Sequence, residues 1–492
     1  MIPHRVRSPR ATVLAASLAI SLGCTSEPPP SPPPPPPPPP TVGLTIAGGN
    51  SQKSVADAEL PVLLRVTATR GGALARGQGV QWEVVSGGAT IVTQTPTDAQ
   101  GIATARIRLT AAGPVSIRAQ LDTARAVFSL TSVTPSSTPV LVGEVSIPPQ
   151  YGIHDTFVRD GIAFVSAWNT GVIIYDVGNG QKGGSPSNPV EIGRLVTSDN
   201  SVPGGPAVHN AWWFHNPVTG EKKYLFIGQE GPATLFSTSS GDLHVVDVSN
   251  LAAPREVASL RIPGAGVHNF WMDEAKQLLY AAFYNEGVVA VDVSGILSGD
   301  LTSRIKARAQ PGGAGNTFAW GVMLAGGALW VSDVVSGFWK LDPTTLVTLG
   351  GGNNVSERWG ADLWVQNQYA YTGTWGGNAR NGSGFGDAVK IWQLAGGGPV
   401  LVDSIRIADI RTVSDLAVSD DGKWLVVTAE KLTKQGLYVY DLANPAKPVL
   451  VGSAVVATGL HTGEVARIGG RLFVFAAKNP ASPSLQVYDI TR

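Results

Sequence analysis

The sequence of 492 residues contains very little cysteine and little charge. Cys24 is its single cysteine, which excludes an internal disulfide, so a hydrophobic core must hold the fold together. Lys and Arg number 36, Asp and Glu also number 36, and the charged fraction is 15%. The formal net charge is therefore zero, which argues against a nucleic-acid partner. The sequence also lacks a phosphate-binding Walker loop and a zincin motif, which excludes these common catalytic sites.

The first 23 residues are typical of an export signal. Three arginines precede an apolar stretch, Ala11 to Ile20, which is too short to span a bilayer as a stable anchor. The segment "SLGC", which ends at Cys24, resembles the lipobox of bacterial lipoproteins, with Ser21 where leucine is usual. The resemblance implies that residues 1–23 are removed, that a lipid on Cys24 makes the membrane a partner, and that the chain is extracytoplasmic, anchored to a bacterial membrane or cell surface. An ordinary secretory signal with an incidental cysteine is the alternative.

Residues 24–40 predict a stalk. After Cys24 the chain reads "PPPSPPPPPPPPP" over 28–40, and proline forms neither helix nor sheet because it lacks the backbone N–H. A polyproline II conformation rises about 3.1 Å per residue, so this segment would extend about 40 Å. We therefore expect the stalk to lift the following residues away from the membrane.

Residues 41–134 predict a small β module. Short runs such as "GVQWEVVSG" and "ARAVFSLTSV" alternate apolar and polar residues, which is typical of an antiparallel β-sandwich. The stretch 96–121 resembles bacterial Ig-like domains of the invasin and intimin type, through the turn formed by Thr97, Asp98 and Gly101 and a core aromatic at Trp82. The resemblance implies a spacer or adhesive unit, in which Asp98 forms a turn and is not a ligand.

Residues 138–492 contain an internal repeat of about 50 residues. One strand type ends in aspartate six times, as in "VIIYDV" (172–177) and "LQVYDI" (485–490), and "VKIWQL" (389–394) is a seventh copy with Gln393 in the aspartate position. Each copy follows another apolar strand; these preceding strands read "IAFVSAW", "YLFIGQE", "LLYAAFY", "ALWVSDV", "YAYTGTW", "WLVVTAE" and "RLFVFAA". Four strands per repeat and seven repeats predict a seven-bladed β-propeller.

The last copy ends without a fourth strand, and the chain supplies a substitute at the start of the repeat region. "TPVLVGEVSI" (138–147) closely matches "KPVLVGSAVV" (447–456), so we expect the strand within 139–147 to complete the seventh blade and close the ring. The predicted fold class is therefore all-β, an Ig-like β-sandwich followed by a seven-bladed β-propeller. The wording "VYDLANPAKPVLVG" resembles the LVIVD-repeat proteins, which implies a secreted bacterial propeller but no particular reaction.

Histidines recur at one position of the repeat, near the start of the first strand of each blade. The residue that follows is Asp or Asn in five blades, which suits a short side chain that hydrogen-bonds to the backbone. The aligned pairs are His154-Asp155, His209-Asn210, His268-Asn269, Ala361-Asp362, Ser414-Asp415 and His461-Thr462, with the fourth blade ambiguous around Trp320.

The four blades that carry histidine are consecutive in the closed ring, which places His461, His154, His209 and His268 at one end of the channel. Neutral imidazoles bind divalent metals, and Asp155 and Glu464 would add carboxylates. Strand side chains usually point into the packing between sheets, however, and histidines from one half of a ring converge off its axis. We therefore favour hydrogen bonds from each histidine to the neighbouring blade, and a metal site is the alternative.

Other residues give weaker signals. His215 and His244 fall outside this register and are expected at the surface or on a strand face. Trp212, Trp213, Trp271 and Trp320 are expected near the same channel end, in the core between blades or walling a pocket. Two Gly- and Ser-rich insertions, "GQEGPATLFSTSSGD" and "TGTWGGNARNGSGFGD", are expected to form loops that carry specificity.

Two functions fit these features. The first is a surface-anchored extracytoplasmic binding protein whose propeller face presents a site for a protein, glycan or small-molecule ligand. The second is a metal-dependent enzyme with a histidine cluster at the channel end, which rests on an analogy between folds. The residues expected at the channel rim are His154, Asp155, His209, Asn210, His268, Asn269, Trp320 and His461, and the four histidines are the candidate metal ligands.

Overall fold

The computed structural model describes residues 40–134, 139–147, 152–199, 207–231, 234–352, 356–376 and 384–491. Nearly all regular structure in these ranges is β-strand, and one 3-10 helix, Thr302–Arg304, is the single helix among them. None of the helical structure in these ranges is long and apolar enough to cross a membrane. The predicted export signal, Cys24 and the predicted stalk up to residue 39 lie outside the described residues.

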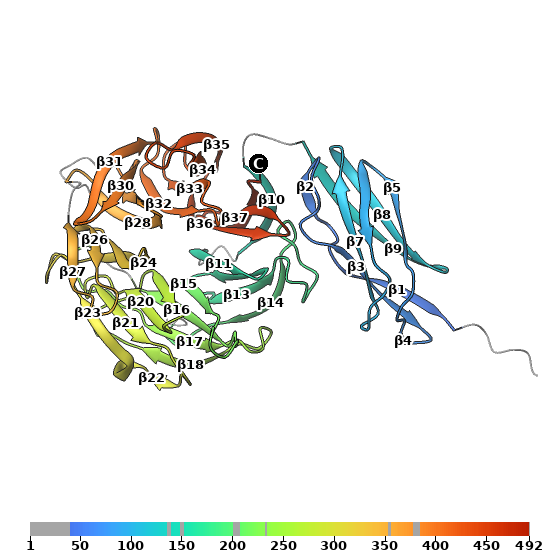
Figure 1. The fold of residues 1–492 in the computed structure, drawn as a ribbon, viewed down its shortest axis with the longest axis horizontal. Helices are drawn as coiled ribbons and strands as arrows, with labels where there is room; N and C mark the ends of the chain where they lie inside the picture. Colours follow the sequence, from blue (N-terminus) through green and yellow to red (C-terminus); the bar gives the residue numbers. More distant parts are fainter. Residues whose placement is uncertain are drawn as a thin grey trace, which may run out of the picture. The chain divides into compact units, whose positions relative to one another are not determined.

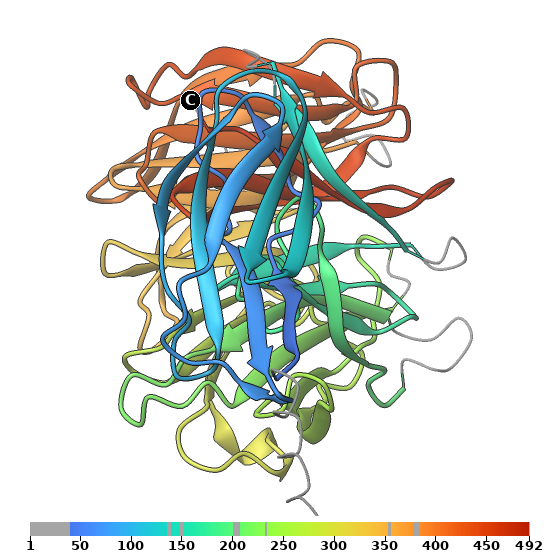
Figure 2. The ribbon, with the colours of Figure 1, turned by 90° about the vertical axis from the view of Figure 1, so that its right-hand side faces the viewer.

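Residues 42–133 form two sheets around one hydrophobic core (Figure 2). Trp82, expected in the core, is 8% exposed and packs against Phe128 with ring centroids 5.6 Å apart. The carboxylate of Asp98 accepts hydrogen bonds from the backbone of Gln100 and Ile102, which is the predicted turn-forming role. One sheet has the order β1-β3-β7-β6 with β4 beside β3, and the other has the order β2-β9-β8-β5; the strands are β1 (Val42–Gly48), β2 (Lys53–Val55), β3 (Leu64–Arg70), β4 (Ala73–Leu74), β5 (Gln81–Ser86), β6 (Ala89–Gln94), β7 (Ile102–Leu109), β8 (Gly113–Leu121) and β9 (Ala124–Val133).

The rest of the described chain folds into seven antiparallel sheets of four strands, arranged in a ring (Figure 1). We number these blades in chain order, and a short strand β22 (Gly299–Asp300) extends the second. The first strands of successive blades contact one another, and β36 contacts β11, so they form a closed inner ring. The strands of blades one to three are β11 (Asp155–Arg159), β12 (Ile162–Ser166), β13 (Val172–Asp176), β14 (Val190–Leu195); β15 (Ala207–Phe214), β16 (Tyr224–Glu230), β17 (Leu243–Asp247), β18 (Arg255–Leu260); and β19 (Phe270–Asp273), β20 (Leu278–Ala282), β21 (Val288–Asp292), β23 (Ile305–Ala309).

The remaining blades follow the same plan. Their strands are β24 (Ala319–Ala325), β25 (Ala328–Asp333), β26 (Gly337–Leu341), β27 (Thr348–Gly352); β28 (Trp359–Gln366), β29 (Tyr369–Trp375), β30 (Ala388–Ala395), β31 (Gly398–Arg406); β32 (Thr412–Val418), β33 (Trp424–Glu430), β34 (Gly436–Asp441), β35 (Val449–Val455); and β36 (Leu460–Ile468), β37 (Arg471–Lys478), β38 (Ser484–Asp489) with β10 (Val140–Ser146).

The seventh blade combines strands from both ends of the repeat region. Its order is β10-β38-β37-β36, and β10 runs antiparallel to β38 from the pair Val140–Asp489 to the pair Ser146–Ser484. The chain therefore closes its ring at the place where the sequence placed the closing strand. Because β10 covers the edge of β38, that edge is not available to pair with another chain.

The aspartate that ends the third strand of most blades has a structural role. Its carboxylate accepts a hydrogen bond from the backbone N–H two residues further on, which forms an Asx turn between the third and fourth strands. These bonds link Asp176 to Gly178, Asp247 to Ser249, Asp292 to Ser294, Asp342 to Thr344, Asp441 to Ala443 and Asp489 to Thr491. The repeated aspartate is thus explained by turn geometry.

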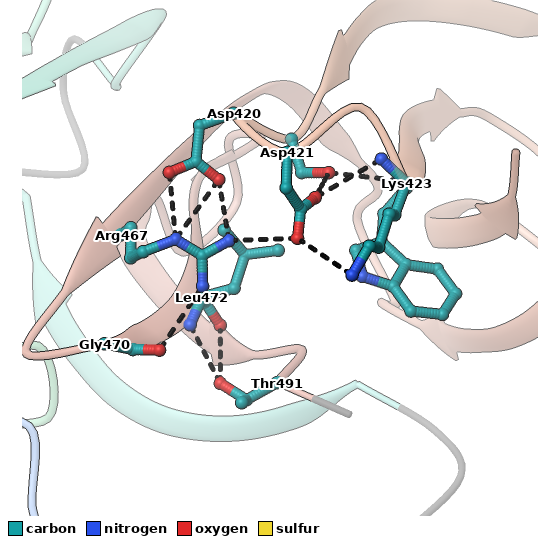
Figure 3. A network of polar contacts seen from close by, with 9 residues as sticks. Asp420, Asp421, Lys423, Arg467, Gly470, Leu472 and Thr491 are labelled. Atoms are coloured by element: carbon teal, nitrogen blue, oxygen red, sulfur yellow. Dashed lines mark hydrogen bonds and ion pairs between the residues drawn. The ribbon is translucent and has the colours of Figure 1, made fainter.

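The hydrophobic core of the ring lies between the blades. Seven buried clusters each combine side chains from two neighbouring blades, and together they include every pair around the ring. Polar contacts add to this packing at the surface. Arg467 of β36 forms ion pairs with Asp420 and Asp421 in the turn between β32 and β33 (Figure 3).

Candidate functional site

The repeat position of the histidines coincides with an irregularity in the innermost strands. Five of these strands have a register shift, or β-bulge, at or beside this position. A bulge places two residues opposite one and re-aims side chains. The bulges lie between Val208 and Asn210, Ala319 and Gly321, Gly360 and Leu363, Val413 and Asp415, and Leu460 and Gly463. Trp320 therefore occupies the histidine position of the fourth blade, with Gly321 as the second member, which resolves that ambiguity.

The four histidines meet at one end of the channel. The ring centroids of His154 and His209 are 3.8 Å apart, those of His209 and His268 are 4.0 Å apart, and those of His154 and His461 are 4.2 Å apart. The Nε2 atoms of His461 and His154 lie 2.7 Å apart. Trp320 continues the row, with its ring 4.1 Å from that of His268.

Side chains from the ends of the second strands surround this cluster. Glu430, the last residue of β33, contacts Nδ1 of His461 through its carboxylate. Oε2 of Glu230, the last residue of β16, lies 4.0 Å from Nε2 of His209 and accepts a hydrogen bond from the hydroxyl of Tyr284. The backbone oxygen of Trp320 lies 2.7 Å from Nδ1 of His268, which fixes the orientation of that ring.

The cluster favours neutral imidazoles at three of its four histidines. Burial lowers the pKa of His154, His209 and His268 well below the ordinary value, and neighbouring histidines lower it further. Burial also lowers the pKa of His461, but Glu430 outweighs this effect and raises it above its ordinary value. Burial raises the pKa of Glu230 to about 7, although the Tyr284 hydroxyl opposes this shift. Neutral imidazoles have a free lone pair, which is the form that binds metals.

A cavity of about 130 Å³ occupies the channel beside the histidines. It is lined by residues from the innermost strands of all seven blades, among them four with carboxyl groups: Asp155, Asp362, Asp415 and Glu464. None of the described residues that line it is Lys, Arg or His. The cavity therefore concentrates acidic groups without basic partners in its wall.

Three of these carboxyl groups, those of Asp155, Asp362 and Glu464, hold their protons more tightly than usual. Burial raises the pKa of Asp155 to about 7, and Asp415 adds to the shift. Burial, and then Asp415, raise the pKa of Asp362 well above its ordinary value. Burial, followed by Asp155 and Asp415, does the same for Glu464. A positive charge placed among these groups would release protons and gain favourable interactions.

An arc of aromatic rings lines the same cavity. Phe157, Trp212, Trp271 and Trp364 occupy equivalent places, two residues after the Asp or Asn position. The ring centroids are 5.2 Å apart for Phe157 and Trp212, 5.3 Å for Trp212 and Trp271, and 6.3 Å for Trp271 and Trp364. All four side chains are partly exposed.

The structure agrees in part with the expected roles of these side chains. We expected each histidine to hydrogen-bond to its neighbouring blade; His268, His461 and His154 do so, the last two through each other, whereas the ring nitrogens of His209 have no partner in the described residues. Asp155 bonds the backbone of Thr156 as expected, but Asn269 bonds the side chain of Asp362, and these residues also line the cavity. Where a bulge is present, as beside His209, it breaks the alternation of side chains along the strand.

Two further expectations can be compared with the structure. His244, expected at the surface or on a strand face, lies within β17 and is fully buried, with its Nδ1 2.9 Å from Oε1 of Glu256. Trp213 is in the core between the first two blades as expected, whereas Trp212 and Trp271 line the cavity and Trp320 lies with the histidines.

The sequence reasoning missed Glu230, Glu430 and Tyr284, although the repeat contained a signal for them. They are the last letters of "YLFIGQE", "WLVVTAE" and "LLYAAFY", three of the seven aligned second strands. The end of the second strand lies beside the start of the first in an antiparallel pair, as shown by Glu230 opposite Ala207. Aligning this column as well as the histidine column would have found all three.

Comparisons with known proteins agree with the fold. The family described as "LVIVD repeat" matches residues 238–261 and 411–456, which contain β17, β18 and β32 to β35. No curated protein matches the chain. A chain of the "Crystal Structure of Mitotic Checkpoint Complex" is similar with a TM-score of 0.52 and 12% identity, over 73% of this chain and 98% of that one. The Cps50 (Swd1) β-propeller domain of Myceliophteria thermophila is similar with a TM-score of 0.50 and 9% identity, over 72% and 100%.

The ring of seven sheets and the solved structures define the class, which is a β-propeller. The repeat match makes this more specific and supports an LVIVD β-propeller. At these identities the solved structures show the fold alone. The fold by itself does not indicate a function, so the chemistry of the site must indicate what it can bind.

Proposed function

We propose that this protein is an extracytoplasmic binding protein, anchored through a lipid on Cys24, whose propeller channel binds a small organic cation. The observation that carries the proposal is the channel cavity, in which carboxyl groups and aromatic faces from the blades converge. Residues 24–40 serve as the stalk and residues 41–134 as a spacer of the Ig-like type. The alternative of a metal-dependent enzyme is not favoured by the comparisons.

The acidic groups support a cationic ligand. Burying a charged carboxylate without an opposite charge is unfavourable, and no described residue that lines the cavity is Lys, Arg or His. The raised pKa of Asp155, Asp362 and Glu464 shows how this burial is tolerated, through retained protons. A ligand with a positive charge would replace those protons and pair with the carboxylates.

The aromatic arc favours an organic cation, which carries alkyl groups, over an inorganic ion. The face of a tryptophan ring attracts cations electrostatically, and such faces also bury the alkyl groups of a quaternary ammonium ion. Trp212, Trp271 and Trp364 provide three such rings in succession. A second, more open cavity of about 480 Å³ shares Phe157, Trp212 and Glu464 with the first and offers a route of entry.

Choline and its neutral carbon isostere, 3,3-dimethylbutan-1-ol, test this ligand class as a matched pair. We expect choline to bind the purified protein in isothermal titration calorimetry, and the isostere to bind at least about tenfold more weakly because it lacks the charge. Equal binding of the two compounds, or no binding of either, would contradict the proposed class.

A matched pair of tryptophan variants tests whether the ligand binds at the aromatic arc. Trp271→Leu removes a ring of the arc, whereas Trp339→Leu changes a partly buried tryptophan that does not line the cavity. We expect choline affinity to fall in the first variant and to stay within about twofold in the second. A loss of affinity in both variants would point to a general effect on folding, and circular dichroism would detect it.

The anchor has a separate test. With Cys24 lipidated, the protein partitions into the detergent phase of Triton X-114 and into membrane fractions. We expect the Cys24→Ser variant to move to the aqueous phase. Equal partitioning of both proteins would exclude the lipid anchor and leave the secretory alternative.

A further inference from the structure

The histidine cluster contains ring nitrogens that the protein itself does not satisfy. His209 is 1% exposed, and neither of its ring nitrogens has a hydrogen-bond partner in the described part of the chain. Nδ1 of His154, which is 5% exposed, is also without a partner there. A buried polar atom without a hydrogen-bond partner is unfavourable, so packing alone is a poor explanation for these side chains.

One of these nitrogens, Nε2 of His209, lies 4.0 Å from Oε2 of Glu230. One donor atom each from His154, His209 and Glu230 fall within 4.8 Å of one another. Donor atoms around a tetrahedral zinc ion are separated by about 3.4 Å, given zinc–nitrogen distances of about 2.0–2.1 Å. Shifts of less than about 1 Å per side chain would therefore bring all three to a common ion.

We propose that His154, His209 and Glu230 bind a divalent first-row transition metal at the histidine end of the channel. Two imidazoles and one carboxylate form a donor set that suits zinc, iron or nickel, whereas magnesium and calcium prefer oxygen ligands alone. This inference does not depend on the proposed organic ligand, because His154, His209 and Glu230 do not line the cavity in which that ligand would bind.

Neighbouring groups hold these ligands in place. The hydroxyl of Tyr284 donates to Oε2 of Glu230, and Nε2 of His461 contacts Nε2 of His154 while its Nδ1 contacts Glu430. Such outer partners orient metal ligands, and their loss typically lowers metal affinity about 10- to 100-fold. Tyr284, His461 and Glu430 are therefore positioning residues for the metal.

Zinc binding to the purified full-length protein tests the site. After treatment with EDTA and removal of the chelator, we expect about one equivalent of zinc to bind in isothermal titration calorimetry, with no comparable binding of magnesium. Cobalt in place of zinc should give visible absorption bands that report histidine ligation. The absence of zinc binding, or equal binding of zinc and magnesium, would overturn the proposal.

Variants assign the ligands. His209→Gln and Glu230→Gln should abolish the zinc site, and Glu430→Gln should weaken it about 10- to 100-fold. His215→Gln is the matched control, because His215 lies outside the cluster and its ring meets that of Trp213 edge to face. Unchanged zinc affinity in His209→Gln and Glu230→Gln would overturn the assignment. If either variant fails to fold, as judged by circular dichroism, the cobalt spectrum of the unmodified protein still decides whether histidine binds the metal.

Discussion

The buried ion pair between β37 and β38 gives a quantitative test of how the last blade is held together. Asp489, at the end of β38, pairs with Arg471 of β37, and their side chains are 1% and 6% exposed. The same carboxylate accepts the Asx-turn hydrogen bond from Thr491 at 3.0 Å, and Asp489 lies opposite Val140 of the closing strand. Replacing Asp489 with Ala leaves the Arg471 charge buried without a partner, which typically costs about 3–5 kcal/mol.

A matched variant separates the two contributions of this aspartate. Asp441 makes the same turn bond, to Ala443 at 2.7 Å, but forms no ion pair within the described residues. We therefore expect Asp441→Ala to lower the free energy of unfolding by about 1 kcal/mol, and Asp489→Ala by about 3 kcal/mol or more. Urea unfolding followed by tryptophan fluorescence measures both values.

Two outcomes would refute this reasoning. The first is a loss in Asp489→Ala that is no larger than the loss in Asp441→Ala. The second concerns the double variant Arg471→Met with Asp489→Ala, which removes the stranded charge. We expect the double variant to be more stable than Asp489→Ala alone, and a further loss of stability would contradict the account.

Three other predictions concern stability. Burial raises the pKa of Glu256, but hydrogen bonds from His244 and Ser198 outweigh this and lower it to about 2. Glu256 thus stabilises the fold above its ordinary pKa, and this stabilisation is lost as the pH falls towards 2. Thermal unfolding measures this: the melting temperature should differ less between pH 6 and pH 3 in Glu256→Gln than in the unmodified protein. An equal difference in the two proteins would be inconsistent with this. Arg467→Ala should lower the free energy of unfolding by no more than about 1 kcal/mol, because the ion pairs of Arg467 are exposed, and high salt should reduce this loss. A larger loss that does not depend on salt, in the same assay, would argue otherwise. Phe475→Ala should cost about 3–5 kcal/mol in urea unfolding, because the ring is fully buried between the seventh and first blades, and a loss below 1 kcal/mol would be incompatible with that packing.

Much of the ring was predictable because each blade repeats one physical solution. The third strands are continuous apolar runs that end in an aspartate, and the Asx turn explains why aspartate recurs there. The match between 138–147 and 447–456 indicated a missing fourth strand, and β10 does pair with β38. Such features depend on local sequence and on the repeat, so they are visible without coordinates.

The site was only partly predictable because it depends on irregular backbone. Sequence alignment found the histidine column, but regular strand alternation would point adjacent residues to opposite faces. The bulges instead let His209 join the cluster while Asn210 lines the cavity. The Nε2 atoms of His154 and His461 are in contact although the two residues are 307 positions apart. This contact depends on ring closure and on side-chain conformations, and the spacing of residues in the sequence does not predict side-chain conformations.

Anomalous diffraction from crystals of the zinc-loaded protein, collected at the zinc absorption edge, tests the central claim most directly. That claim is that the innermost strands direct the histidines into the channel, where they assemble a binding site. We predict one strong anomalous peak between His154, His209 and Glu230. A map without a peak there, or with these imidazoles turned into the packing between blades, would contradict the account.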